Sequence, residues 1–179
     1  QLEVQQHERR QRTAPFPGNA VSMVKDFDVV VEGADNYATK FLTADACRLE
    51  ARPAVHGAAV RFRATAFSVS PGGAPCYRCV FEDLPPNEGS LSCAEAGVTG
   101  PLVGVAGALL ADLALDVLSG APRYGTLYTY DGLSDRLRGI EIAARRGCNL
   151  CGAEPGISRI DELCYTQARL GPHGLPLIG

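Results

Sequence analysis

The feature that most constrains the fold of this chain is a pair of CxxC motifs that lie far apart in the sequence. The first is CYRC at residues 76–79 and the second is CNLC at residues 148–151. Two cysteines with this spacing can bind one metal ion from a single tight turn, and two such turns complete a tetrahedral zinc shell. The predicted zinc ligands are Cys76, Cys79, Cys148 and Cys151. Because four cysteines leave no open coordination position, this zinc would be structural rather than catalytic.

Two other interpretations of these cysteines stay open, namely two disulfides or four unrelated buried thiols. The chain has seven cysteines, an odd number, and residues 1–12 are polar and charged, unlike a secretory signal. Reduced thiols in the cytoplasm fit these observations best, so we expect a cytoplasmic protein.

Composition limits the classes of partner. The 179 residues are enough for one domain with a sizeable core, and the hydrophobic and charged fractions, 46% and 21%, are ordinary for a globular protein. The net charge is −3, and no stripe of basic and aromatic residues runs along the chain. We therefore expect no nucleic-acid partner. The small basic cluster at residues 9–12 indicates a solvated face or, alternatively, a phosphate contact.

The apolar stretch at residues 98–118 is almost long enough to span a bilayer. It contains Asp112 and Asp116, however, and ionisable groups inside a membrane span are costly. A buried core helix is the better interpretation, so we expect no membrane partner. The glycines at positions 100, 104 and 107 would let another backbone approach one face of this helix closely.

A strand–turn–helix unit is predicted near the start of the chain. Residues 27–31 form a β-branched apolar run, typical of a strand that is buried on both faces in a parallel sheet. A polar turn follows, and then a predicted helix over residues 37–51. Asp35 and Asn36 stand at the carboxyl end of the strand, where ligands gather in open α/β sheets. A carboxylate there can hold Mg²⁺ bound to phosphates; the alternative is that Asp35 or Asn36 only caps the helix.

The rest of the sequence also indicates an α/β fold. Further strands are predicted at residues 54–60, 63–70, 125–130 and 136–143, with a weaker one at 2–7 and short helices near 19–25 and 157–165. His56 is more typical of an interior histidine than of a catalytic one, although both readings stay open. Cys47 falls inside the first long helix and is predicted to pack in the core.

Cys93 occupies a different position from the other cysteines. It follows a loop rich in proline and glycine and precedes the long apolar helix. The partial positive charge of a helix N-terminus favours a thiolate, the reactive form of cysteine. Cys93 is therefore either a functional thiol or a small buried apolar residue.

Several nucleotide-binding motifs are absent from the sequence. No GxGxxG follows a predicted strand, and no glycine-rich stretch leads into the Lys-Ser/Thr of a P-loop. Pattern and spacing alone therefore indicate an α/β zinc protein with one aspartate that is a candidate for phosphate binding and one cysteine that is a candidate for reactivity. They indicate no specific activity.

Several segments together resemble one family. The run DVVVEGADNYATK at residues 28–40 resembles the Asp-Asn segment of the E1-like adenylyltransferases, which activate ubiquitin-like sulfur-carrier proteins. The resemblance continues in the same order through residues 55–59, 75–79, 92–98, 130–131 and 148–152. The long proline-bearing loop before Cys93 is similar to members that serve molybdopterin synthase or tRNA thiolation.

The resemblance implies a fold and a set of roles. The chain would be the C-terminal half of a Rossmann-like adenylation domain with a Cys₄ zinc site, over residues 1–155, followed by a tail at 156–179. Asp35 would handle Mg²⁺ and the phosphates of ATP, with Asn36 beside it in the nucleotide site. Cys93 would form a covalent adduct with the carrier. Glu95 and Gly97 match the same motif, but no role is assigned to them.

The resemblance also implies a reaction and partners. The C-terminal glycine carboxylate of the carrier would attack the α-phosphate of ATP, and pyrophosphate would leave. Members are typically homodimers, so a homodimer is expected. The chain departs from the family pattern in three ways. The family's glycine-rich ATP loop lies upstream of the matched segments and is missing from this sequence. Arg63-Ala64-Thr65 replaces the usual Glu-Gly-Gln, and Lys40 replaces the usual Arg. The alternatives are a non-catalytic, zinc-stabilised carrier-binding module and a zinc-stabilised structural piece.

Overall fold

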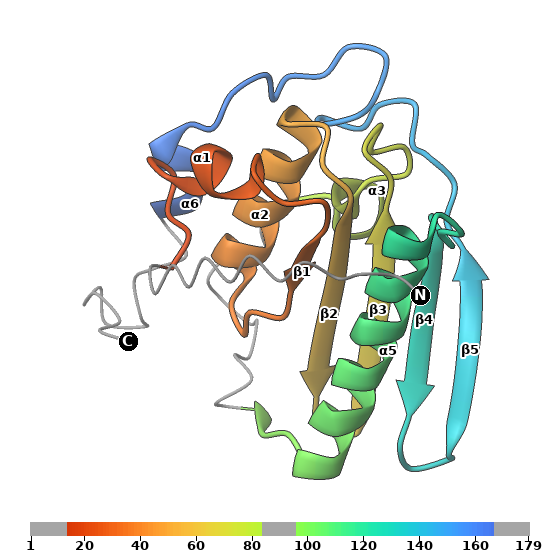
Figure 1. The fold of residues 1–179 in the computed structure, drawn as a ribbon. Helices are drawn as coiled ribbons and strands as arrows, with labels where there is room; N and C mark the ends of the chain where they lie inside the picture. Colours follow the sequence, from red (N-terminus) through yellow and green to blue (C-terminus); the bar gives the residue numbers. More distant parts are fainter. Residues whose placement is uncertain (1–13, 84–95, 167–179) are drawn as a thin grey trace.

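The structure is a computed structural model that describes residues 14–83 and 96–166. Its helices are α1 (Ala20–Val24), α2 (Tyr37–Leu49), α3 (Tyr77–Phe81), α5 (Gly100–Ser119) and α6 (Glu162–Thr166). Its strands are β1 (Val30–Glu32), β2 (Ala54–Val60), β3 (Arg63–Val69), β4 (Thr126–Asp131) and β5 (Arg136–Glu141). The alternation of strands and helices confirms the predicted α/β class (Figure 1).

The five strands form one mixed sheet in the order β1-β2-β3-β4-β5. Only β1 and β2 run parallel, because α2 carries the chain back between them; β2, β3, β4 and β5 are joined as antiparallel neighbours. The parallel pairing expected for the first strand is therefore confirmed by its pairing with β2, whereas the other strand pairs are antiparallel. The short connections between β2 and β3 and between β4 and β5 favour antiparallel pairing, because a parallel pair needs a long crossover. The connection from β3 to β4 is long and contains α3 and α5.

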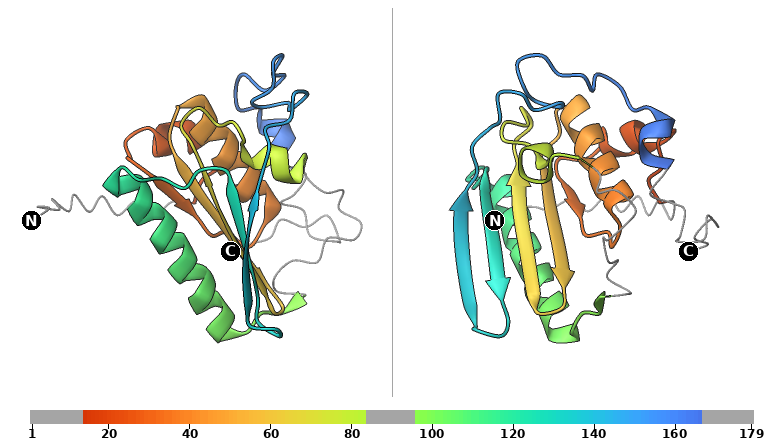
Figure 2. Two further views of the ribbon diagram at one scale, coloured as in Figure 1. Left: turned by 90° about the vertical axis from the view of Figure 1, so that its right-hand side faces the viewer. Right: turned by 180° about the vertical axis from the view of Figure 1, so that it is seen from behind.

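The two faces of the sheet are covered by different helices. Figure 2 shows α5 on one side of the sheet, with α2 and α3 on the other. Gly57 allows the close approach of α5, because a Cβ at this position would lie 2.6 Å from Cδ1 of Leu110. On the opposite face, Phe67 packs beside the cysteine motifs. The core is thus two apolar layers on either side of β2 and β3.

The prediction of a fully buried helix for the apolar stretch is only half right. One face of α5 packs on the sheet through Leu102, Ala106, Leu113 and Ala114. The outer face is open: Leu115 and Leu118 are 64% and 58% exposed, and nothing lies within 4 Å of a Cβ added at Gly104 or Gly107. Among the described residues, α5 is the one helix long and apolar enough to cross a membrane by length and composition. Here it lies along the sheet.

The first strand also differs from its prediction. The chain forms β1 only over Val30–Glu32, and Val31 is 50% exposed. The reason is that β1 is the edge of the sheet, with a hydrogen-bonded neighbour on one side alone among the described residues. The β-branched apolar run therefore lies at an edge of the sheet, and the prediction that it is buried on both faces is wrong.

Other boundaries agree with the sequence to within a few residues. The strands β2 to β5, the helix α2 and the helix α5 occupy their predicted positions. The short helix α3 at the first CxxC motif was not predicted, and α6 is shorter than expected. The weak strand predicted at residues 2–7 lies outside the described residues.

Candidate functional site

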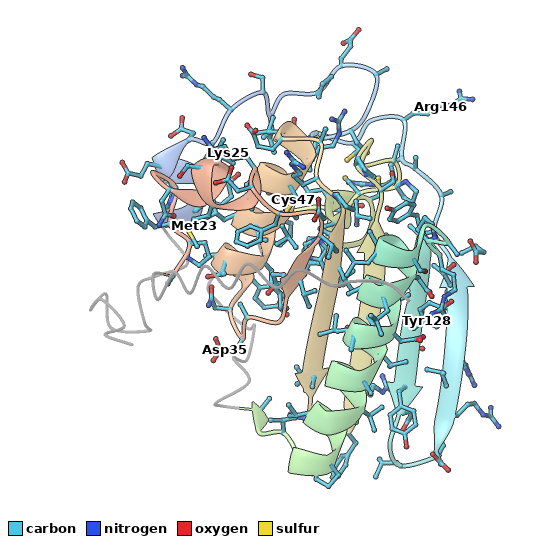
Figure 3. The ribbon with its side chains drawn as sticks, in the orientation of Figure 1. Met23, Lys25, Asp35, Cys47, Tyr128 and Arg146 are labelled. Atoms are coloured by element: carbon cyan, nitrogen blue, oxygen red, sulfur yellow. The ribbon has the colours of Figure 1, made fainter. Side chains whose placement is uncertain are left out.

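The turn between β1 and α2 carries the predicted nucleotide residues. Asp35 is exposed at the carboxyl end of β1, and Figure 3 shows it at the outer tip of this turn. Asn36 is the N-cap of α2: its Oδ1 accepts a hydrogen bond from the Thr39 N–H at 2.8 Å. The capping role that the sequence left open is therefore present for Asn36. Asp35 caps nothing in α2, and its exposed carboxylate is free to bind a cation. The helix N-terminus beside it favours the negative charge of phosphates.

Directly beneath this turn lies a buried ionic cluster of Glu32, Lys40 and His56. The Lys40 ammonium lies 3.2 Å from Glu32 Oε2 and donates to the carbonyl oxygen of Gly57 at 2.5 Å. His56 Nδ1 lies 3.3 Å from the same Glu32 Oε2. The Ala34 N–H donates to Glu32 Oε1, so the carboxylate also holds the backbone of the turn.

The charge state of this cluster follows from its contacts. Burial raises the pKa of Glu32, but the hydrogen bond with His56, the Lys40 ammonium and the Ala34 N–H outweigh it and hold the pKa below its usual value of 4.5. Glu32 is therefore ionised at neutral pH and can only accept hydrogen bonds. The carboxylate fixes the turn that precedes Asp35.

A cavity of about 290 Å³ lies along the free edge of β1. Its floor is apolar, from Met23, Phe27, Val30 and Val31, and it ends at the Glu32–Ala34 turn. An apolar pocket that ends at a polar turn is the usual form of a small-molecule site. This cavity adjoins the turn that carries Asp35.

The four cysteines of the CxxC motifs come together, as the sequence predicted. Their sulfur atoms all lie within 4.8 Å of one another, with Cys76 Sγ 3.5 Å from Cys148 Sγ and Cys79 Sγ 3.4 Å from Cys151 Sγ. Tetrahedral zinc with Zn–S bonds of about 2.3 Å requires S···S separations of about 3.8 Å. The geometry and the donor set therefore fit one Cys₄ metal site, and these four thiols are not joined as disulfides.

The surroundings shift the pKa values of these thiols in different directions. Burial, together with the neighbouring thiols, raises the pKa of Cys76 far above its usual value and the pKa of Cys151 to about 11. For Cys148, burial is outweighed by the backbone N–H groups of residues 150 and 151, which lower its pKa to about 7. A metal ion that binds all four sulfurs would have to displace the protons that remain on them.

Charged side chains tie the first CxxC motif to α2. Arg78 lies between Cys76 and Cys79 in the sequence. Its guanidinium donates two hydrogen bonds to the carboxylate of Asp45 in α2, from Nε to Oδ1 at 2.9 Å and from Nη2 to Oδ2 at 2.8 Å. Tyr165 of α6 donates to the same carboxylate, and Asp45 is fully buried. The Arg145 N–H donates to Cys79 Sγ at 3.4 Å. These contacts fix the cysteine cluster against α2, the helix that Asn36 caps.

The structure separates the two groups of predicted site residues. Both CxxC motifs follow strands that run in the same direction, β3 and β5, so they meet at one end of the sheet. Asp35 follows β1, which runs antiparallel to β3 through β2, and so lies toward the opposite end. Cys93 and Glu95 lie outside the described residues, and the predicted reactivity of Cys93 stays a prediction. Cys47 is buried in the core, as predicted, and burial raises its pKa to about 12.

Sequence reasoning missed several residues that shape the site. These are Glu32, Asp45, Tyr77, Arg78 and Tyr165. One signal was available: an acidic residue at position 45 inside an apolar helix stretch, and a basic residue at position 78 inside a cysteine motif, each require a buried partner. The sequence does not show that Asp45 and Arg78 pair with each other, because this pairing depends on contacts between segments that are far apart in the chain.

Comparison with known proteins gives a consistent result. The model of the ThiF family matches residues 1–151. The adenylyltransferase and sulfurtransferase MOCS3 of Dictyostelium discoideum is 37% identical over 152 residues, which cover 83% of this chain and 35% of that protein. The protein of the same name from Sus scrofa is 39% identical over 149 residues, which cover 82% of this chain and 33% of that protein. The chain thus spans about a third of the length of these relatives.

Solved structures show the same fold at lower identity. E. coli MccB in complex with MccA-N7isoAsn superimposes with a TM-score of 0.57 at 18% identity, over 70% of this chain and 40% of that one. E. coli MccB with ATP gives a TM-score of 0.56 at 16% identity, over 69% of this chain and 40% of that one. At this level of identity the likeness concerns the fold alone.

Proposed function

Because the chain belongs to the ThiF family, we propose that it takes part in the ATP-dependent adenylylation of the C-terminal glycine of a ubiquitin-like sulfur-carrier protein. The observation that carries this proposal is the exposed Asp35 at the carboxyl end of β1, beside an apolar cavity of about 290 Å³. The match to the MOCS3 proteins, named adenylyltransferases and sulfurtransferases, supports a molybdopterin or tRNA-thiolation carrier.

In the proposed reaction, a carboxylate oxygen of the carrier forms a bond to the α-phosphorus of ATP. The bond from that phosphorus to the pyrophosphate oxygen breaks, and pyrophosphate leaves with its electron pair. Asp35 would hold Mg²⁺, which neutralises charge on the phosphates. Glu32 holds the turn that presents Asp35, through the Ala34 N–H. Catalysis of this kind consists of positioning and charge neutralisation.

The chain would supply the carrier-side and zinc-side half of the complete enzyme, and the glycine-rich ATP loop would come from elsewhere. Two observations support this division: no strand of the described residues pairs with the outer edge of β1, and the chain covers about a third of the relatives. The Cys₄ cluster would hold a structural zinc ion, since its geometry leaves no open position. Asn36 would border the nucleotide while it caps α2. Six cysteines in the described residues are free thiols, which supports a cytoplasmic location.

The test is carrier-dependent exchange between ATP and pyrophosphate, measured on the native gene product and on this chain. Asp35→Ala should lower the exchange rate by about 10²–10³-fold, the usual effect of losing one charge-stabilising group. Asp28→Ala is the matched control, because Asp28 is an exposed carboxylate that precedes the same strand. Equal rates for the two variants would remove Asp35 from the proposed site.

The second candidate function is a non-catalytic, zinc-stabilised module that binds the carrier. The observation that favours it is that the chain spans only about a third of its relatives. Carrier pull-down without nucleotide, together with no ATP binding and no exchange by the native gene product, would support this alternative. Exchange that depends on Asp35 would reject it.

A further inference from the structure

The short helix α6 packs on α2 and depends on one buried tyrosine. Of the α6 side chains that the structure describes, Glu162 and Cys164 are exposed, whereas only 3% of Tyr165 is exposed. The Tyr165 ring belongs to the apolar cluster that contains Phe41 of α2, and Ile160 packs against the same cluster just before the helix. A helix of five residues is not stable by itself in water. The position of α6 therefore depends on what holds Tyr165.

The hydroxyl of Tyr165 donates a hydrogen bond to the carboxylate of Asp45, which is fully buried. Burial, together with this carboxylate, raises the pKa of Tyr165, so its hydroxyl keeps the proton that it donates. The same carboxylate accepts hydrogen bonds from Arg78 Nε and Nη2 at 2.9 and 2.8 Å. A buried carboxylate without an opposite charge is costly, so the partner that Tyr165 binds depends on Arg78.

Arg78 is in turn positioned by the cysteine cluster. It lies in the turn between Cys76 and Cys79, which is closed by a hydrogen bond from the Cys79 N–H to the Cys76 carbonyl oxygen at 2.9 Å. Beside the second motif, Arg145 donates from Nη2 to the Arg78 carbonyl oxygen at 2.9 Å. The sulfurs of both motifs lie within 4.8 Å of one another. A metal ion bound to all four sulfurs would join the two motifs and hold the turn that carries Arg78.

We propose that α6 is a metal-dependent latch, which closes on α2 when a metal ion occupies the Cys₄ cluster and opens when the ion is lost. The path runs from the first CxxC motif through Arg78 and Asp45 to Tyr165, and each of these side chains is hydrogen-bonded to the next. α6 is the last described element before residues 167–179, so the latch determines where the chain leaves α2. This device goes beyond the proposed adenylylation, and its test needs neither ATP nor a carrier.

Hydrogen exchange, read by mass spectrometry on the zinc-loaded 179-residue chain, measures the latch directly. Removal of zinc by a chelator should raise the exchange rate of the peptide that covers α6 by about 10-fold, the effect of losing one hydrogen bond to a charged group. Zinc added back should restore protection, and β2 and β3 should stay protected throughout. Equal protection of α6 with and without zinc would overturn the proposal. So would a simultaneous loss of protection in β2 and β3, because the whole domain would then be unfolding.

A change of one atom breaks the last link of the path without altering a cysteine. Tyr165→Phe should raise the exchange rate of α6 about 10-fold while zinc stays bound. Tyr130→Phe is the matched control, because Tyr130 also donates to an aspartate, Asp135, but lies in β4. It should leave α6 unchanged. Native mass spectrometry gives the zinc content of each variant. The same response of α6 to both substitutions would reject the Tyr165 contact as the latch.

The double variant Arg78→Gln, Asp45→Asn breaks the middle of the path without leaving either charge buried alone. In this protein α6 should exchange rapidly whether or not zinc is bound. An α6 that still closes when zinc is added would reject Arg78 and Asp45 as the link.

Coupling between two sites acts equally in both directions. Tyr165→Phe should therefore weaken zinc binding, by up to the factor by which zinc protects α6, whereas Tyr130→Phe should not. Competition with a chromogenic chelator measures the zinc affinity, and calorimetry shows that each variant is folded. Equal zinc affinities for folded wild-type and Tyr165→Phe proteins would show that α6 and the cysteine cluster are independent, and would end the latch proposal while leaving the proposed function untouched.

Discussion

At the residue scale, the turn before Asp35 depends on one buried carboxylate. Glu32 contacts Lys40, His56 and the Ala34 N–H at once. Burial raises the pKa values of Cys47 and Tyr77, and the charge of Glu32 raises both further. A charge removed from water needs partners of this kind, because its desolvation is costly. Removing the carboxylate would leave the Lys40 ammonium buried without an opposite charge.

Glu32→Gln should lower the free energy of unfolding by about 3–5 kcal/mol at neutral pH, the usual cost of breaking a buried ion pair. The effect should depend on pH. The folded-state pKa of Glu32 is depressed below 4.5, so its stabilisation is present above pH 4.5 and is lost as the pH falls through the folded value. The measurement is urea unfolding of both proteins as a function of pH.

The wild-type and Glu32→Gln stability curves should converge at acidic pH, because the wild-type carboxyl is then protonated like the amide. Glu154→Gln is the control, since Glu154 is exposed. Curves that stay parallel down to the acid limit would show that Glu32 is not ionised in the folded protein.

At the scale of elements, two contacts hold the helices to the sheet and to the metal site. Arg78 and Asp45 join the first CxxC motif to α2, and Leu110 of α5 packs on Gly57 of β2. The first contact is electrostatic and the second is steric. A single substitution can break each contact, and a second substitution at the partner residue tests whether the two residues are coupled.

Cys148→Ser should remove zinc and lower the melting temperature by about 10 °C, because a structural zinc site contributes several kcal/mol of folding free energy. Native mass spectrometry gives the metal content, and calorimetry gives the melting temperature. Cys47→Ser is the control for thiol loss, because Cys47 lies apart from the cluster in the core. It should keep one zinc ion. A Cys148→Ser protein that retains full zinc would contradict the Cys₄ assignment.

Gly57→Ala should cost about 1–3 kcal/mol, because the added methyl group would lie 2.6–2.8 Å from Leu110 and force this well-packed contact apart. The same substitution should cost less than half as much in a Leu110→Ala background, where the space is vacated. Chemical denaturation of the four proteins in this cycle gives the coupling. Gly147→Ala, where an added Cβ meets nothing within 4 Å, should be close to neutral. Additive effects in the cycle would rule out the steric explanation.

At the scale of the whole molecule, the outer face of α5 is an apolar surface that the described residues leave open. Small residues at positions 104, 107, 108 and 111 continue into Leu115 and Leu118 along one stripe of exposed positions. Small residues at helical spacing allow two helices to approach closely. This stripe supports the homodimer that was expected from the family resemblance.

The double substitution Leu115→Lys and Leu118→Lys should convert a dimer into a monomer of 18.9 kDa, because two charges would be buried at the interface. Analytical ultracentrifugation over a range of concentrations measures this change. Leu133→Lys is the matched control: Leu133 is 76% exposed but lies in the β4–β5 turn. A wild-type chain that stays monomeric at high concentration would refute the dimer prediction.

The sequence by itself determined the features that depend on local spacing. The CxxC motifs specified a cluster of four cysteines that could hold a metal ion, because two residues between cysteines place both sulfurs on one turn. Alternating and helical apolar patterns located β2 to β5, α2 and α5, since side-chain direction follows backbone geometry. Asn36 was identified as a candidate cap from its position before a helix.

Only the tertiary structure decided which distant residues meet. Asp45 and Arg78 are buried together, and His56 faces Glu32 across two strands, because sheet pairing and helix packing bring these segments into contact. Exposure was decided in the same way: Val31 and Leu115 have the composition of core residues, yet each lies where no described segment covers it. Local sequence specifies what an element can bury, and the packing of the whole chain determines what is buried.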